Sequence, residues 1–396
     1  MALAQAWRWF GPNDRVTLPS IDQAGARHIV SALHHIPVGE IWPVEEIQHH
    51  KNFIENNQLQ LKWTVVESVN VHEAIRQGKD SRDKYIENYA CTLRNLAKAG
   101  IHTVCYNFMP LLDWTRTHLN FELANGARTL RFDKTAFAAF DLFVLKREEA
   151  FGEYTPKQIE RAKVYINHHS KHELRNLTNT ILQGLPGTLK VLSLSEFRDL
   201  LAQYDHFTKE QFQANLKYFL EHIIPVAEEV GVNLCCHPDD PAFPLFGIPR
   251  IVSTENDLEY LVHCVNSPNN GITYCTGSLS SNAENDLCGI IKQLGHKIHF
   301  AHLRNIIREA DGSFYEAEHL GGSFDMAEIM KLLVMESENR KAVGRLDFEI
   351  PYRPDHGHQI LDDQQKKMPF PGYSAIGRLK GLAELRGLEQ GIRAMM

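Results

Sequence analysis

Four residues with metal-binding side chains each stand at the end of, or shortly after, a short apolar or β-branched run in the second half of the chain. They are His237 after residues 233–236, Cys275 at the end of 272–275, His302 after 298–301, and Asp355 shortly after 348–352. If these runs are parallel barrel strands, their carboxyl ends converge at one mouth despite the distance between them in sequence. Two imidazoles, a thiolate and a carboxylate suit a first-row divalent ion, with zinc, iron(II) and manganese(II) all chemically allowed and one or two positions left open for substrate.

Each of these residues is a weak signal when taken alone. A histidine or aspartate at a strand end is more often a cap or a hydrogen-bonded loop residue, and a free cysteine usually packs as a small apolar side chain. Cys235 and Cys236 compete with Cys275 as thiol ligands, but strand alternation points them to opposite faces, so we interpret both as packing residues. The convergence of four residues predicts the metal site.

Polar residues around these ligands are candidates for catalysis. His356 follows Asp355 directly, and an imidazole whose ordinary pKa lies near neutrality suits a general acid or base. Tyr373 lies in a Pro-Gly-Tyr-Ser turn and can act as a phenolic donor. From the residues alone, a packed aromatic with a bonded hydroxyl is the favoured interpretation of Tyr373.

Four further residues are candidates for binding the substrate. The planar forks of Arg304 and Arg353 can pair with a substrate carboxylate, or can instead orient Asp355 or another acid. His35 and Asn107 lie near other predicted strand ends and would complete a polar mouth.

These residues require a repeated βα scaffold, which the hydrophobic pattern predicts. The eight expected strands are Trp7–Phe10, His28–Leu33, Leu61–Val66, Thr103–Asn107, Asn233–Cys236, Ile272–Cys275, Ile298–Ala301 and Phe348–Tyr352. The expected helices are Pro43–Asn56, Ser81–Ala99, Lys209–Val230, Glu255–Asn266, Ala283–Leu294, Met326–Glu338 and Ala375–Glu389. Eight strands interleaved with helices predict an α/β fold, a (β/α)8 TIM barrel forming a single catalytic domain over residues 1–396.

One stretch, at about residues 110–204, does not fit the repeat. It is expected to be a helical insertion after the fourth strand, and it should emerge at the carboxyl-terminal face of the barrel, where such enzymes place their active sites. A lid or rim, an oligomer contact and a decorative helical hairpin are all compatible with it.

Composition narrows the class of partner. The chain has 396 residues, 43% of them hydrophobic and 23% charged, with a net charge of -7 and no block of like charges. This favours a small-molecule substrate over nucleic acid or an anionic membrane. No run approaches the roughly 20 apolar residues of a membrane span, and no signal peptide is evident, so a cytoplasmic location is expected. Seven cysteines without a C-x-x-C pattern indicate reduced thiols, and a homodimer is the expected assembly.

Several longer motifs give the chain a specific resemblance. They are Trp7–Asp14 (WRWFGPND), Ala32–Pro37 (ALHHIP), Val65–Val69 (VVESV), Thr103–Pro110 (TVCYNFMP), Asp113–Thr117 (DWTRT), His237–Pro241 (HPDDP), Arg353–His358 (RPDHGH) and Gly372–Arg378 (GYSAIGR). With these motifs, which run from end to end, the chain resembles the D-mannonate dehydratase family. The length of the middle segment resembles that of the longer members.

The resemblance implies a xylose-isomerase-like barrel, a Mn²⁺ or Fe²⁺ ion, and ligands at His237, Cys275, His302 and Asp355. It also implies catalytic roles for His356 and Tyr373, against the packing interpretation of the tyrosine. The implied reaction of glucuronate catabolism removes water from D-mannonate and yields 2-dehydro-3-deoxy-D-gluconate. A base would take the C2 proton and an acid would protonate the departing C3 hydroxyl; the sequence does not divide these two roles between His356 and Tyr373.

Two alternatives remain open at this point. A metal-dependent sugar or sugar-acid isomerase or epimerase on the same barrel would use a similar ion but typically more carboxylate ligands. A non-catalytic sugar-acid binding protein is the more distant alternative.

Overall fold

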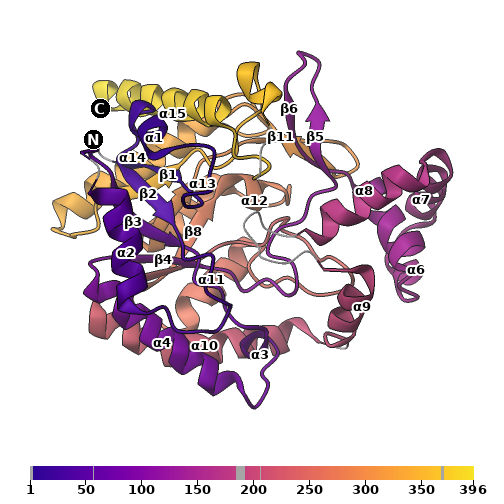
Figure 1. Cartoon of the computed structure of the whole chain (residues 1–396), viewed down its shortest axis with the longest axis horizontal. Coiled ribbons are helices and arrows are strands. Elements are labelled where there is room, and N and C mark those ends of the chain that lie inside the picture. Colours follow the sequence, from indigo (N-terminus) through magenta and orange to yellow (C-terminus); the bar gives the residue numbers. More distant parts are fainter. Residues whose placement is uncertain (1–2, 57, 184–191, 206, 367–369) are drawn as a thin grey trace.

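Eight parallel strands close into a barrel in the computed structural model, which describes residues 3–56, 58–183, 192–205, 207–366 and 370–396 (Figure 1). Around the barrel the strands follow the order β1-β12-β9-β8-β7-β4-β3-β2. Their bounds are β1 Leu3–Arg8, β2 His28–Ser31, β3 Lys62–Glu67, β4 Thr103–Tyr106, β7 Asn233–Cys236, β8 Asn270–Cys275, β9 Ile298–His302 and β12 Ile350–Arg353. The predicted TIM barrel is confirmed.

Each expected strand overlaps a barrel strand, but the first is displaced. The expected strand Trp7–Phe10 begins four residues after β1 does, because residues 3–6 of β1 include no β-branched or aromatic residue to mark a strand. Most of the apolar side chains inside the barrel are small. Its apolar filling consists of Ala6, Val30, Val65, Cys105, Cys235 and Phe300.

Helices surround the barrel. Their bounds are α1 Leu18–Gln23, α2 Val44–Glu55, α3 Glu73–Arg76, α4 Arg82–Lys98, α10 Lys209–Val230, α11 Glu255–Cys264, α12 Thr276–Ser280, α13 Leu287–Leu294, α14 Met326–Ala342 and α15 Ala375–Met395, with 3₁₀ turns at Gly295–Lys297 and Leu361–Gln365. The longest, α10, shows how the local sequence sets such bounds. The Thr208 hydroxyl accepts from the backbone N–H of Gln211 at its start, and Gly231 at φ +66° ends it in the left-handed conformation that glycine adopts without strain.

Between β4 and β7 the chain leaves the barrel. The segment opens with two strands, β5 His118–Glu122 and β6 Arg128–Phe132. Helical elements follow: α5 Lys134–Ala139, a π-helical turn at Phe140–Leu145, α6 Ala150–Glu153, α7 Pro156–His168, α8 Lys171–Leu182 and α9 Leu194–Ala202. Residues 184–191 of the expected insertion lie outside the described residues. Figure 1 shows α6 and α7 on the side of the molecule away from the N-terminus.

The hairpin of this segment was not expected, and it belongs to a second sheet. That sheet has the order β10-β11-β6-β5, and its other two strands, β10 (Ile306–Arg308) and β11 (Phe314–Glu316), come from the loop after β9. The insertion after the fourth strand therefore begins with a hairpin and is helical beyond it. Strands of three to five residues carry too little periodicity to stand out from loop sequence. None of the helices in the described part of the chain has the length and apolarity needed to cross a bilayer.

Candidate active site

Three neighbouring barrel strands bring the metal-binding side chains together. His237 follows β7, Cys275 ends β8, and His302 ends β9, where it pairs in register with Cys275. One ligand atom from each of the three lies within 4.8 Å of the others. The His237 Nε2 and His302 Nδ1 atoms are 3.1 Å apart. Two atoms that ligate one ion at about 2.1 Å lie about 3 Å apart, so the spacing of these two nitrogens fits a shared ion.

One nitrogen of each imidazole faces this cluster, and the other faces an oxygen of the protein. His237 Nδ1 lies 2.7 Å from the Pro238 carbonyl, to which it donates, so Nε2 faces His302 as a lone pair. His302 Nε2 lies 3.5 Å from a carboxylate oxygen of Glu67, which leaves Nδ1 for the cluster. Metal-ligating histidines characteristically give their second nitrogen to a carbonyl or carboxylate in this way. Burial also lowers the pKa of His237 and so favours the neutral, ligating form.

Asp355, the fourth expected ligand, lies beside these three residues. Its carboxylate Oδ2 is 3.9 Å from the Cys275 sulfur. It is also ion-paired with Arg353 and lies 3.1 Å from Arg304 Nε. Burial would raise the pKa of Asp355, but these guanidinium groups hold it well below its usual range, so the side chain is ionised. The structure thus places a carboxylate next to the thiol, and coordination by Asp355 stays a prediction.

His356 and Tyr373 lie together in the lining of a pocket that His237 of the cluster also lines. Their rings meet edge to face with centroids 5.2 Å apart, because the loop after β12 and the turn before α15 are joined by a backbone hydrogen bond from Gly357 to Gly372. Tyr373 is 3% exposed. Burial raises the pKa of its phenol, although Arg353 and Arg8 act in the opposite direction, so the hydroxyl is protonated at neutral pH.

The pocket contains most of the residues expected from the sequence. It is lined by Arg8, Glu67, Ser68, Asn107, Asp113, Trp114, His237, Asp240, Arg353, Asp355, His356 and Tyr373. Asn107 and Arg353, two of the four expected substrate-binding residues, are therefore at the pocket. The other two, Arg304 and His35, do not line it.

His35 lies apart from this pocket. Its side chain is 63% exposed, and its Nε2 is 3.3 Å from Glu46 on α2. The preceding residue, His34, is half-buried and stacks on Phe10, which in turn contacts Tyr373 edge to face. Substrate binding by His35 is a sequence prediction that the described geometry does not support.

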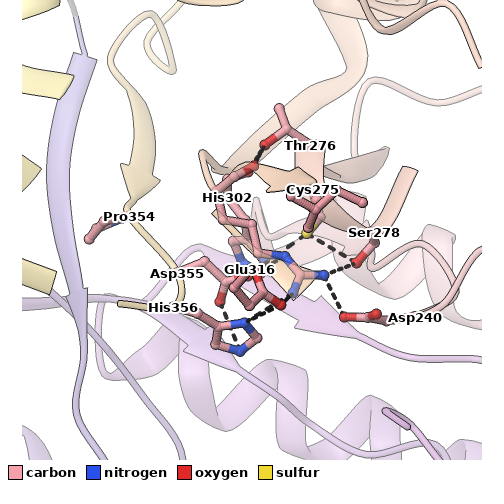
Figure 2. A network of polar contacts seen from close by, with 12 residues as sticks. Asp240, Cys275, Thr276, Ser278, His302, Glu316, Pro354, Asp355 and His356 are labelled. Carbon is pink, nitrogen blue, oxygen red and sulfur yellow. Dashed lines mark hydrogen bonds and ion pairs between the residues drawn. The ribbon is translucent and has the colours of Figure 1, made fainter. Parts of the chain in front are cut away.

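Arg304 is engaged by acidic side chains of the protein. Its Nη2 donates to Asp240 at 2.6 Å, and its Nη1 is ion-paired with Glu316. Of the two roles that the sequence leaves open for Arg304, orientation of acids is the one that these contacts match. Figure 2 shows Asp240, Glu316, Asp355 and His356 gathered in one network beside Cys275 and His302.

The sequence interpretation missed the two residues that complete this network. Arg116, fully buried, donates to Asp240 at 2.8 Å and to Glu316 at 2.9 Å. Glu316, on β11, lies 3.1 Å from His356 Nδ1. Burial alone would raise the pKa of Glu316, but Arg304 and His356 lower it to about 2. Arg116 was visible only as part of the Asp113–Thr117 motif, and nothing in the sequence around Glu316 marks it.

Comparison with known proteins agrees with the site and the fold. The profile of the family described as D-mannonate dehydratase (UxuA) matches residues 3–396. The mannonate dehydratase of Marinomonas sp. (strain MWYL1) is 48% identical over 395 residues and covers 100% of both chains. That of Saccharophagus degradans is 46% identical over 386 residues, covering 98% of this chain and 97% of its own.

Solved structures agree as well. The crystal structure of mannonate dehydratase from Streptococcus suis serotype 2 superposes with a TM-score of 0.77 at 33% identity, covering 99% of this chain and 94% of that one. A xylose isomerase domain protein from Planctomyces limnophilus, at 10% identity and a TM-score of 0.50, shares the fold alone and covers 100% of this chain and 99% of that one. The chain belongs to the D-mannonate dehydratase family.

Proposed function

We propose that the protein is a metal-dependent hydro-lyase that converts D-mannonate to 2-dehydro-3-deoxy-D-gluconate. The observation that carries this proposal is that His356 and Tyr373, two side chains suited to acid–base chemistry, line the same pocket as His237, which belongs to the cluster of His237, Cys275 and His302. Membership of the D-mannonate dehydratase family supplies the substrate class.

His237, Cys275 and His302 would hold the ion, with Asp355 as the fourth ligand. A divalent ion there supplies Lewis-acid stabilisation of the negative charge that develops on the substrate when C2 loses its proton. The mixed nitrogen and sulfur donor set allows manganese(II) or iron(II).

The two acid–base residues have different environments, and these divide the roles. The buried phenol of Tyr373 is protonated at neutral pH, so we assign it to protonate the C3 hydroxyl, which leaves as water. His356 then takes the C2 proton through Nε2, because its Nδ1 faces Glu316. The electron pair of the C2–H bond forms the C2–C3 double bond as the C3–O bond breaks. The resulting enol becomes the 2-keto acid when C3 gains a proton.

The remaining polar groups of the pocket suit an acidic, hydroxylated substrate. Arg8 and Arg353 bring positive charge to the wall beside Tyr373, and both are paired with Glu67. We assign Arg353 and the amide of Asn107 to orient the substrate. A sugar isomerase on the same barrel would typically use more carboxylate ligands, whereas the tight cluster here holds a thiol and two imidazoles.

The test is an assay of chelator-stripped protein on D-mannonate, with manganese(II) or iron(II) restored, following the 2-keto-3-deoxy acid. We expect product only after an ion is restored. Full activity after exhaustive chelation, checked by metal analysis, would contradict the proposed metal dependence. Metal-dependent formation of an isomer of D-mannonate in place of the keto-deoxy acid would instead support the isomerase alternative.

A further inference from the structure

Glu316 is a buried carboxylate that the sequence interpretation does not single out, and it enters the proposed mechanism only as the neighbour of His356 Nδ1. It ends β11 and is 3% exposed. Its Oε1 lies 3.1 Å from His356 Nδ1, on the opposite side of the imidazole from the Nε2 that would take the substrate proton. Figure 2 shows the Glu316 and His356 side chains turned toward each other.

The surroundings of Glu316 decide the direction of this hydrogen bond. Arg116 Nη2 donates to the same carboxylate oxygen at 2.9 Å, and Arg304 Nη1 also donates to it. Between two guanidinium groups the carboxylate is ionised, and an ionised carboxylate only accepts hydrogen bonds. Arg304 Nη1 lies 3.0 Å from His356 Nδ1 as well, but this group already donates to the Glu316 carboxylate. We therefore place the shared hydrogen on Nδ1, because the other tautomer would set an Nδ1 lone pair 3.1 Å from an ionised carboxylate oxygen with no hydrogen between them. This leaves the lone pair of a neutral imidazole on Nε2.

The second sheet holds both partners of this hydrogen bond. Strand β6 pairs with β11 through Phe132 and Phe314, and the Thr129 hydroxyl donates to the backbone carbonyl of Glu316 at 3.3 Å. The same strand is joined to the loop that carries His356. Arg128 and Gln359 exchange two backbone hydrogen bonds of 3.0 and 2.8 Å.

We propose that Glu316 is a positioning residue that fixes the tautomer and orientation of His356, and that strand β6 of the insertion is the platform that holds the pair. The inference rests on the proposed catalytic role of His356. It gives the start of the insertion, through strand β6, a role in supporting the catalytic site, in place of a lid or an oligomer contact.

Two glutamate variants of the same sheet region test the proposal by kinetics. Glu316→Gln removes the charge that orients Nδ1. Glu309→Gln removes a carboxylate that accepts from Arg131 Nη2 at 2.7 Å without touching His356. We expect Glu316→Gln to lower kcat by about 10²- to 10⁴-fold, with KM within about threefold of wild type and an unchanged metal content. Glu309→Gln should retain wild-type kcat. Equal kinetics for the two variants would overturn the proposal.

The tautomer itself is a readout that a merely structural role of Glu316 would not move. Nitrogen-15 spectra of histidine-labelled protein, loaded with diamagnetic zinc and assigned with a His356→Gln variant, should show the hydrogen on Nδ1 of His356 in the wild type. A hydrogen on Nε2 would overturn the proposal even if Glu316→Gln fails to fold. If wild-type protein produces no keto-deoxy acid, the proposed function fails, whereas the spectrum still decides whether Glu316 sets the tautomer.

Discussion

The two halves of the site come from different parts of the fold. The proposed ion-binding half consists of His237, Cys275 and His302 at the carboxyl ends of adjacent barrel strands. The acid–base half contains His356, whose far nitrogen is held by Glu316 from a second sheet. The comparison shows that barrel closure alone assembles the metal donors, whereas orientation of the acid–base residue requires strands outside the barrel.

The largest expected effect comes from removing a donor of the ion-binding half. Cys275→Ser should reduce bound manganese or iron to below one tenth of the wild-type content and lower activity to background, because a hydroxyl is a far poorer ligand than a thiolate. Cys235→Ser is the matched control. That thiol is equally buried, but it packs in the barrel interior and donates to the Val104 carbonyl.

The measured quantities are the metal content and the kcat of both purified variants. The control should keep its ion and its activity, at a cost of about 1 kcal/mol in the free energy of unfolding. If Cys235→Ser lost the ion and Cys275→Ser retained it, Cys235 rather than Cys275 would be the thiol ligand.

The next effect belongs to the acid–base half. Tyr373→Phe removes only the hydroxyl that we assign to protonate the leaving group, so kcat should fall by about 10²- to 10⁴-fold with little change in melting temperature. Tyr106→Phe is the control, because its hydroxyl is buried in the core, outside the pocket lining. Steady-state kinetics on D-mannonate separate the two variants, and equal rates would remove Tyr373 from the mechanism.

The buried ion network that joins the two halves predicts a pH-dependent stability. The pKa of Glu316 is about 2 in the folded protein and near 4.5 when unfolded. A lowered folded-state pKa stabilises the protein above pH 4.5, and this contribution, about 3 kcal/mol from Glu316, is lost as the pH falls toward 2. Arg116→Met removes one of the two guanidinium groups beside the carboxylate.

We expect this variant to lose about 3–5 kcal/mol at pH 7 and to depend less steeply on pH between 4.5 and 2. Denaturant unfolding of metal-free wild type and variant across this range measures both effects. If the free energies of unfolding of wild type and Arg116→Met changed in parallel with pH, the network would not contribute to the pH dependence of stability.

The smallest expected effect is at His35. Because its exposed ring contacts Glu46 and does not line the pocket, His35→Ala should keep kcat and KM within about twofold of wild type. A tenfold rise in KM would instead restore the sequence prediction that His35 binds substrate.

The ion-binding half could be predicted from the sequence because it follows from strand order. A parallel barrel brings strand ends together whatever their separation in sequence, so three apolar runs ending in His237, Cys275 and His302 were enough. Glu316 could not be predicted in this way. It ends a three-residue strand whose partner β6 lies about 180 residues earlier in the chain, and no periodicity links the two.

The arginines of the site show the same limit of prediction from sequence. From the sequence, Arg304 and Arg353 were equal candidates for a substrate carboxylate. Only the three-dimensional positions of Asp240 and Glu316 show that Arg304 is committed to acids of the protein, whereas Arg353 also lines the pocket. Side-chain partners brought together by loops depend on packing that no local pattern encodes.

The most direct test of the account is a crystal structure of the protein loaded with manganese(II), with anomalous diffraction used to locate the ion. The account predicts one strong anomalous peak within about 2.5 Å of His237 Nε2, Cys275 Sγ and His302 Nδ1, beneath His356 and Tyr373. A crystal of catalytically active protein whose only anomalous peak lies away from these three side chains would contradict this prediction.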